Sequence, residues 1–330
     1  MSYTELAHKA DNIPVAIGTG VALTALDVAV HGSWPLRASY AILGAALVGA
    51  TSGHSPVGYA LLGAAVLSTG IGYARSLVGG GAGGIRPAVA MTLWTGNSLS
   101  DAWRVQRQDF IDVQPNVMIL HISPSGGEGA LAVVQEARAA IPGLRIWVQL
   151  SCGSRDAAGI VETARRVVEE TGAEAVSWNA EHSFKDPGGD EVARAICAGW
   201  AAISNIPQMQ SAYGNPMQHH SYPWSAWFPP CIISLCQDYP IGEDVRSGTQ
   251  PDGLLTDRVA RDTVGWNEAV AAGMIPATVY RGTYIPGAHM TTDDVLRACS
   301  GIDYVAVWPW HGRYDEPVKA ALKQLARSRS

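Results

Sequence analysis

Short apolar runs and longer amphipathic segments alternate along the chain from residue 86 onward. The apolar runs have the length and β-branched content typical of buried strands. They are residues 88–94, 116–123, 145–151, 173–181, 207–213, 231–239, 275–282 and 303–310. The amphipathic segments repeat with the period of a helix and are residues 127–141, 156–172, 190–204, 257–273 and 316–328. The pattern therefore predicts an α/β domain in which strands and helices take turns.

The near-continuous apolar character of these strands is typical of a parallel sheet that is buried on both faces. Eight strands, with room for a helix after each, predict a (β/α)8 TIM barrel over residues 88–330. No GxGxxG follows the first strand, which disfavours a dinucleotide-binding, doubly wound sheet.

The beginning of the chain has a different amino-acid composition. Residues 13–30, 39–50 and 57–72 are apolar stretches rich in Ala and Gly, and only Asp27 places a charge inside them. We therefore predict that residues 1–77 form a small, apolar, all-α region. Residues 78–87 follow as a glycine-rich linker and mark a domain boundary.

Two interpretations of this apolar region stay open. A helix that spans a bilayer needs about 20 apolar residues, so the first and third stretches are marginal as spans and the second is short. Small residues at four-residue spacing allow close helix packing, either in a membrane or in a homo-oligomeric assembly through residues 13–72. The polar start of mixed charge predicts no cleavable signal peptide. We expect a protein associated with a membrane, a virion or a cell envelope.

Composition narrows the possible partners and cofactors. Charged residues make up only 16% of the chain and the formal net charge is -6, which gives no reason to expect a nucleic-acid partner. The five cysteines have no CxxC spacing and are interpreted as reduced, mostly buried thiols. The adjacent pair His219–His220 lacks any HxxxH or HExxH context, so we expect no metal site and no cofactor.

In a barrel of this kind, chemistry lies at the carboxyl ends of the strands. The predicted strand ends carry polar and aromatic side chains where a packed interior would favour Val, Ile and Leu. Those interpreted as substrate-binding are Trp94, Gln149, Tyr213, Gln237, Tyr239, Tyr280, Arg281, Trp308 and Trp310. Ten of the 11 tryptophans follow the linker, which favours amphipathic rings at a binding surface. Such a set predicts a sugar-binding cleft, in which indoles stack on sugar rings and amides and carboxylates bind hydroxyl groups.

Two further features have competing interpretations. The aromatic loop 213–230 is either a wall of the substrate cleft or a lid packed on the barrel rim. His121, on the second strand, is better explained as a hydrogen-bonded interior histidine than as a catalytic base. A Schiff-base aldolase would need a lysine at a strand end, and Lys185, Lys319 and Lys323 are not predicted at one.

The fourth strand ends with Glu174-Ala175-Val176-Ser177-Trp178-Asn179-Ala180-Glu181, which resembles the DGxDxDxE signature of family 18 glycoside hydrolases, the chitinase-like barrels. The final glutamate matches, whereas Ser177 and Asn179 replace two aspartates. The sixth strand's Leu235-Cys236-Gln237-Asp238 is similar to the family's MxYD, with Tyr lost and Asp kept. Trp308 stands where the family has a tryptophan at the eighth strand.

The resemblance implies that Glu181 protonates the glycosidic oxygen while Asn179 orients the acetamide of the substrate, which attacks the anomeric carbon. The Asn-x-Glu spacing is similar to that of family 85 endo-β-N-acetylglucosaminidases. Because a strand alternates faces, Asn179 and Glu181 should point into the barrel and Trp178 outward. Asp238 is the third catalytic candidate, either assisting Glu181 or forming a two-carboxylate pair with it.

The sequence therefore predicts a glycosidase that acts on an N-acetylated glycan such as peptidoglycan or a chitin-like polymer. The alternative is a non-catalytic structural or glycan-binding barrel of a virion or cell surface, because two acidic positions of the motif are lost. In that case Glu181 would be a structural carboxylate, for instance one paired with Arg281.

Overall fold

The computed structural model describes residues 85–94, 98–124, 126–153, 155–228, 230–239 and 253–329. These residues belong to one compact unit, Gly81–Ser330. The apolar region 1–77, including stretches 13–30, 39–50 and 57–72, and residues 78–84 of the linker lie outside the described residues. Within the described part of the chain, no helix has the length and hydropathy needed to cross a bilayer.

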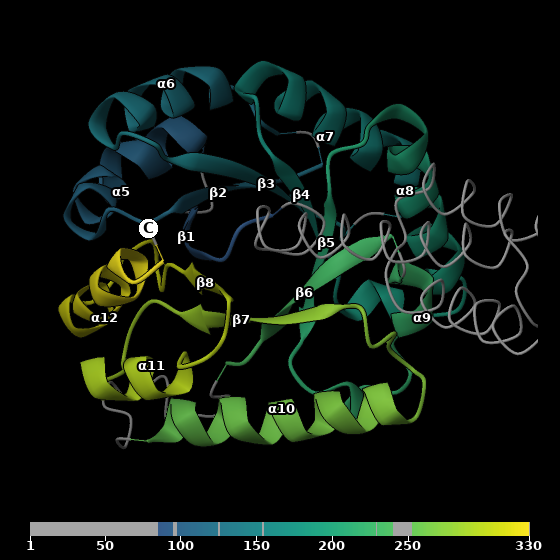
Figure 1. Cartoon of the computed structure of the whole chain (residues 1–330). Helices are drawn as coiled ribbons and strands as arrows, with labels where there is room; N and C mark the ends of the chain where they lie inside the picture. The colour runs from purple at the N-terminus through teal and green to yellow at the C-terminus, as the bar shows by residue number, and fades with distance from the viewer. Residues whose placement is uncertain are drawn as a thin grey trace, which may run out of the picture. The chain divides into compact units, whose positions relative to one another are not determined.

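Eight parallel strands form a closed barrel in the order β1 to β8, and helices surround it (Figure 1). The strands are β1 (Ala88–Leu93), β2 (Val117–Ile122), β3 (Arg145–Ser151), β4 (Ala175–Asn179), β5 (Gln208–Tyr213), β6 (Cys231–Gln237), β7 (Tyr280–Pro286) and β8 (Tyr304–Trp308). Pairing of β1 with β8 closes the sheet, with Ala88 opposite Tyr304 and Met91 opposite Val307. The predicted (β/α)8 barrel is confirmed.

The helices cover the outer face of the sheet. They are α5 (Leu99–Val113), α6 (Ala130–Ala140), α7 (Ala157–Thr171), α8 (Gly189–Ile203), α9 (Trp224–Trp227), α10 (Leu254–Ala271), α11 (Thr292–Ala298) and α12 (Glu316–Arg327), with the short 3-10 turns η3 (His182–Phe184) and η4 (Pro216–Gln218). Side-chain caps fix where several begin. The Ser98 hydroxyl accepts from the Asp101 amide at the start of α5, and the Asp156 carboxylate accepts from the Gly159 amide at the start of α7.

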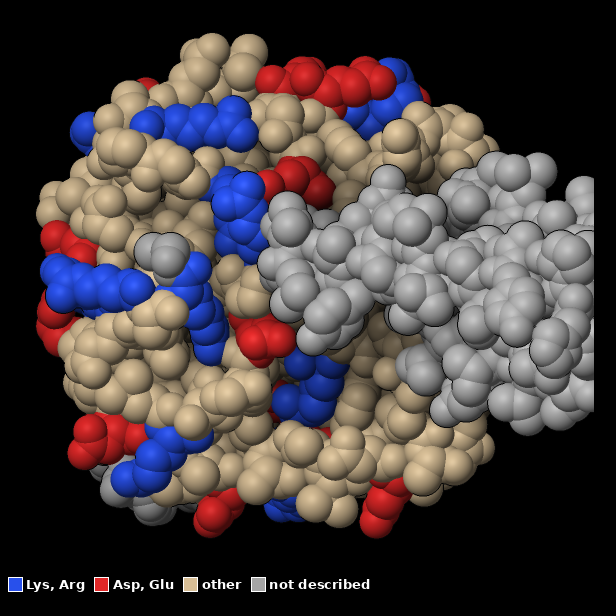
Figure 2. Space-filling model, in the orientation of Figure 1, with Lys and Arg blue, Asp and Glu red and all other residues tan. Residues whose placement is uncertain are grey.

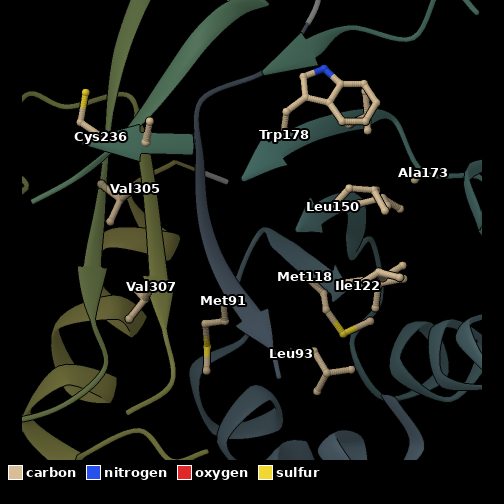
Figure 3. Packing of buried hydrophobic residues seen from close by; sticks show 14 of the residues in the cluster. Met91, Leu93, Met118, Ile122, Leu150, Ala173, Trp178, Cys236, Val305 and Val307 are labelled. Atoms are coloured by element: carbon tan, nitrogen blue, oxygen red, sulfur yellow. The ribbon is translucent and has the colours of Figure 1, made fainter. Parts of the chain in front are cut away.

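Alternation along each strand divides the apolar residues between two layers. One set faces the helices and forms the larger core, part of which is seen in Figure 3, where Met91, Leu93, Met118, Leu150 and Trp178 are among the labelled side chains. The other set fills the barrel interior. It consists of Ile85, Ala88, Ala90, Val117, Ile119, Trp147, Ala175, Met209, Ile233, Leu235, Tyr284, Tyr304 and Ala306. The barrel interior is therefore packed with side chains.

One strand lies away from its predicted position. The apolar run 275–282 predicted the seventh strand, but β7 begins at Tyr280 and continues to Pro286. Ile275 and Val279 are buried in the helix-facing core, which explains their apolar character without a strand. The strand residue Gly282 is needed for close packing, because a Cβ there would lie 2.9 Å from both Leu235 Cδ2 and the Tyr304 carbonyl oxygen.

Charges are dispersed over the surface. Figure 2 shows Lys and Arg side chains beside Asp and Glu side chains on the face seen in Figure 1. Exposed pairs along helices account for part of this mixture, such as Arg165 with Glu162 and Glu169 on α7. Pairs of this kind contribute little to stability, since solvent screens them.

Candidate functional site

An amide and a carboxylate meet at the carboxyl end of the barrel. β4 ends at Asn179, and Glu181 follows two residues later on the same side. Across the barrel mouth, the Gln237 Nε2 atom at the end of β6 donates to Asn179 Oδ1 at 3.0 Å and to Glu181 Oε1 at 2.9 Å. One amide nitrogen thus uses both of its hydrogens to hold the two side chains together.

Aromatic rings form one wall beside this group. The Trp94 and Trp308 rings lie 4.5 Å apart at the ends of β1 and β8, and His121 meets the Trp308 ring edge-on at 4.9 Å. Tyr284 of β7 also meets Trp308 edge-on, at 6.3 Å. Both indoles are half-buried. A half-buried indole pair at a barrel mouth is suited to stack on a flat, partly apolar ligand.

A hydrogen-bond chain supports the wall from below. Gln149 Oε1 lies 2.9 Å from His121 Nδ1 and accepts from the Tyr284 hydroxyl at 3.2 Å, and that hydroxyl lies 2.7 Å from Thr92 Oγ1. Burial lowers the pKa of His121, although the Gln149 contact and the Glu181 charge act in the opposite direction. His121 is thus a hydrogen-bonded interior histidine, as its position on the second strand suggested.

The charge of Glu181 helps to raise the pKa of three nearby tyrosines. Burial raises the pKa of Tyr213 to about 12, and the Glu181 carboxylate adds to that increase. Burial also raises the pKa of Tyr239 and Tyr284, and Glu181 contributes to both. The Tyr239 ring lies 6.2 Å from the Tyr284 ring. These phenols therefore stay protonated near neutral pH and serve as hydrogen-bonding groups.

Beneath Asn179 lies a layer of buried polar groups. Gln149 is the register partner of Ser177, and Asn179 is the partner of Ser211. The Gln149 Nε2, Ser177 Oγ and Ser211 Oγ atoms are buried and have no hydrogen-bond partner among the described residues. Buried polar atoms of this kind are rare in packed protein interiors and mark hydrogen-bonding capacity that water or a ligand can use.

Asp238, the third catalytic candidate, lies outside this group. Its side chain is fully buried between the sheet and α10, where Oδ1 accepts from Arg281 Nη2 at 2.6 Å and Oδ2 accepts from Thr283 Oγ1 at 2.5 Å. Asp262 of α10 lies close by, since a Cβ on Gly214 would be 2.5 Å from a carboxylate oxygen of each aspartate. Residue 238 faces outward because Gln237, its neighbour on β6, faces the barrel mouth.

Two other residues expected at the site, Arg281 and Tyr280, lie outside it. Arg281 pairs with Asp238 rather than with Glu181, which leaves Glu181 without the guanidinium partner considered above. Tyr280 stands at the beginning of β7, at the opposite end of the barrel, and its ring contacts Tyr304 at 6.1 Å. Both misplacements follow from the shifted position of the seventh strand.

Trp310 lies beyond the end of β8. It opens a tight turn closed by mutual backbone hydrogen bonds with Arg313, and its ring lies 5.3 Å from His311 and 6.0 Å from His289. The wall described above therefore consists of Trp94 and Trp308, with Trp310 on the loop beyond them.

The aromatic loop 213–230 packs mainly on the rim. Tyr222, Trp224 and Trp227 are each at most 2% exposed, and the Tyr222 hydroxyl accepts from Gln210 on the helix-facing side of β5. Near the mouth the loop contributes His219, whose ring stacks on Tyr213 at 3.9 Å. The interpretation as a packed lid fits most of this loop.

Sequence reasoning missed Tyr284, Thr92 and Lys185. Tyr284 was hidden by the misplaced seventh strand. The Lys185 Nζ atom lies over the Tyr213 ring, 4.1 Å from its centroid, and 2.9 Å from His219 Nδ1. Its position in the loop directly after the fourth strand was the available signal.

In the part of the chain that the structure describes, no group of three or more His, Cys, Asp and Glu side chains is arranged to hold a metal ion.

Solved structures share this fold. A GH18 chitinase from the chitin utilization locus of Flavobacterium johnsoniae is similar with a TM-score of 0.53 and 8% identity, over 72% of this chain and 93% of the chitinase. A chitinase from Bacteroides thetaiotaomicron gives 0.54 and 8%, over 74% and 97%. Active domain 2 of a thermostable chitinase from Pyrococcus furiosus, complexed with chito-oligosaccharides, gives 0.51 and 10%, over 73% and 93%.

No protein-family model matches the sequence, and no curated protein matches it. The chain is thus a chitinase-like TIM barrel in its fold, at very low sequence identity to the solved chitinases.

The buried Asp238–Arg281 pair predicts a pH-dependent stability. Burial raises the pKa of Asp238 to about 7, although the Arg281 charge lowers it. A carboxyl with a raised folded-state pKa contributes stability below its unfolded pKa of about 4, and that contribution is lost as the pH rises through 7.

We expect the unfolding free energy of the wild type to fall between pH 5 and pH 8 relative to Asp238→Asn, by up to about 1.4 kcal/mol per pH unit. Urea unfolding of both proteins, followed by tryptophan fluorescence, measures the difference. Parallel pH profiles would show that Asp238 is ionised throughout.

Proposed function

We propose that this protein is a glycoside hydrolase acting on an N-acetylated glycan by a substrate-assisted mechanism. The observation that carries the proposal is the arrangement in which Gln237 holds Asn179 and Glu181 together at the mouth of the barrel, beside the Trp94–Trp308 wall. It combines a proton donor, an amide that can orient a ligand and a surface on which a sugar ring can stack.

In the first step, the Glu181 carboxyl donates its proton to the glycosidic oxygen. The acetamide carbonyl oxygen of the sugar forms a bond to C1 as the bond from C1 to the leaving sugar breaks, and the electron pair of that bond remains on the leaving oxygen. Water then adds to C1 and gives a proton to the Glu181 carboxylate. As the new bond from water to C1 forms, the bond between C1 and the acetamide oxygen breaks, and the acetamide is restored. The anomeric configuration is retained.

This route needs no second protein carboxylate as nucleophile. A route without a second carboxylate suits this site, because both oxygens of Asp238 bind Arg281 and Thr283 on the outer side of the sheet. A retaining mechanism with a protein nucleophile would need two carboxyl groups about 5 Å apart facing the same sugar.

Asn179 and Gln237 then position the acetamide. The Asn179 Oδ1 atom accepts from Gln237 with one of its two lone pairs, so the second lone pair can accept from the N–H of the acetamide, and the Asn179 amide nitrogen can donate to another group of the ligand. The polar layer of Gln149, Ser177 and Ser211 beneath it offers further hydrogen-bonding capacity. The chito-oligosaccharides bound to the Pyrococcus furiosus chitinase, which has a similar fold, support a polysaccharide ligand.

A non-catalytic, glycan-binding barrel is the second candidate. The presence of Ser177 and Asn179, where the chitinase-like signature has acids, favours it. Under this candidate the Trp94–Trp308 wall binds sugar and Glu181 only accepts hydrogen bonds.

Replacement of the proton donor separates the two. We expect Glu181→Gln to lower kcat on chitin hexamers or peptidoglycan strands by about 10²- to 10⁴-fold, the usual contribution of general acid catalysis, while the dissociation constant changes little. Reducing-end release and tryptophan fluorescence titration measure the two quantities. Glu191→Gln, an exposed carboxylate on α8, is the matched control. Equal lack of turnover in wild type and variant, with glycan bound by both, would establish the second candidate.

We also propose that residues 13–72 attach the barrel to a lipid surface, whether of a cell membrane or of an enveloped particle. Their apolar, small-residue composition supports this. The full chain should float with phosphatidylcholine vesicles in a density gradient and remain with them in 1 M salt. A full chain that instead stays at the bottom of the gradient as a defined oligomer would favour assembly through protein contacts.

A further inference from the structure

A lysine stands at the barrel mouth, close to the candidate catalytic group. Lys185 follows η3 in the loop after β4, and its Nζ atom lies over the face of Tyr213 from β5. The Tyr213 pKa responds to the Glu181 charge, which places this phenol within electrostatic reach of the proposed acid. Tyr213 is also the register partner of Gln237, whose amide donates to Glu181, so the lysine lies over a direct neighbour of the Gln237–Glu181 pair.

The lysine is held in place without being neutralised. An ammonium group can only donate, so Lys185 donates to His219 Nδ1 at 2.9 Å, and the imidazole offers a lone pair but no charge. The Tyr213 ring adds a cation–π contact. Among the residues that the structure describes, no Asp or Glu lies within ion-pair distance of Lys185.

The loop that carries the lysine is clamped from outside. Arg155 donates to the Ser183 and Pro187 carbonyl oxygens, on either side of Lys185, at 2.7 Å each. Asp186, the acidic neighbour in the loop, lies 3.7 Å from Arg155. The nearest acidic residue in sequence is therefore paired elsewhere, and the lysine charge is presented on a fixed support.

The two sides of the mouth differ in character. Trp94 and Trp308 form a neutral aromatic wall at β1 and β8, whereas Tyr213, His219 and Lys185 form a stacked, cationic wall at β4 and β5. In the order of the barrel these strand pairs are opposite each other. A glycan crossing the mouth over Glu181 would place one sugar on the neutral wall and its neighbour on the cationic wall.

We propose that the cationic wall binds a carboxylate on the sugar next to the cleaved bond, so that the substrate is an acidic N-acetylated glycan rather than neutral chitin. A single ammonium group matches the charge of one carboxylate. The inference rests on the proposed hydrolase function and specifies its substrate class.

A matched pair of glycans tests it. The first is a strand of alternating N-acetylglucosamine and N-acetylmuramic acid freed of stem peptides, which carries a lactyl carboxylate on every second sugar. The second is the same strand with those carboxyl groups reduced to alcohols. We expect the wild type to cleave the acidic strand with about tenfold higher kcat/KM, the effect of one charge-assisted hydrogen bond.

Variants assign the preference to Lys185. Lys185→Met keeps the length of the apolar stem and should abolish the preference, whereas Lys185→Arg should retain most of it. Lys323→Met, an exposed lysine on α12, should leave it unchanged. The Glu181→Gln protein provides an independent readout, because its affinity for the acidic strand should exceed that for the reduced strand and should fall with salt.

Failure of the carboxylate site and failure of the hydrolase activity give different results in these experiments. Equal cleavage of both strands by wild type and Lys185→Met would overturn the carboxylate inference and leave the hydrolase intact. If no strand is cleaved, the binding comparison decides: a Lys185-dependent preference supports the carboxylate site alone, and equal or absent binding overturns it.

Discussion

Closure of the eight-stranded parallel sheet is the constraint on which the site depends. In a closed barrel every second residue of every strand points into one shared interior, and the register of each pair fixes the level at which those residues meet. Gln237 pairs in register with Tyr213 and with Tyr284, and Asn179 pairs with Ser211, the inward residue that precedes Tyr213 on β5, so four neighbouring strands bring polar side chains to the mouth. A shift of one residue in any of these strands would turn its polar side chain into the helical layer.

The interior below that level is packed with apolar residues, whereas the polar level at the mouth is only partly satisfied. Gln237 holds Asn179 and Glu181, while Gln149, Ser177 and Ser211 each keep a polar atom that has no hydrogen-bond partner among the described residues. A barrel needed only for its stability would gain by filling this level with apolar side chains. Retained polar capacity at the end of a barrel where ligands bind is the physical reason to assign function there.

Alternation and apolar runs were enough to predict the barrel, because parallel strands buried on both faces leave a clear signal in the sequence. The inward direction of Asn179 and Glu181 also followed from strand parity. Parity applied to β6 would have turned Asp238 outward, away from Gln237, but the resemblance to MxYD favoured both residues. The position of β7 was not predictable from apolar runs, because Ile275 and Val279 are apolar for burial in the helix-facing core and Gly282 is small to let three strands approach. Lys185 was missed because contacts between loops have no signature in strand periodicity.

The proposed hydrolysis requires an N-acetylated sugar to lie over Asn179 and Gln237 with its glycosidic oxygen at Glu181. A crystal structure of the Glu181→Gln protein soaked with an N-acetylated oligosaccharide tests this most directly. We expect an acetamide in contact with Asn179 and Gln237, a sugar ring stacked on Trp308, and the glycosidic oxygen within hydrogen-bond distance of the side chain at position 181. An oligosaccharide bound elsewhere on the barrel, with the mouth closed over the polar level, would contradict it.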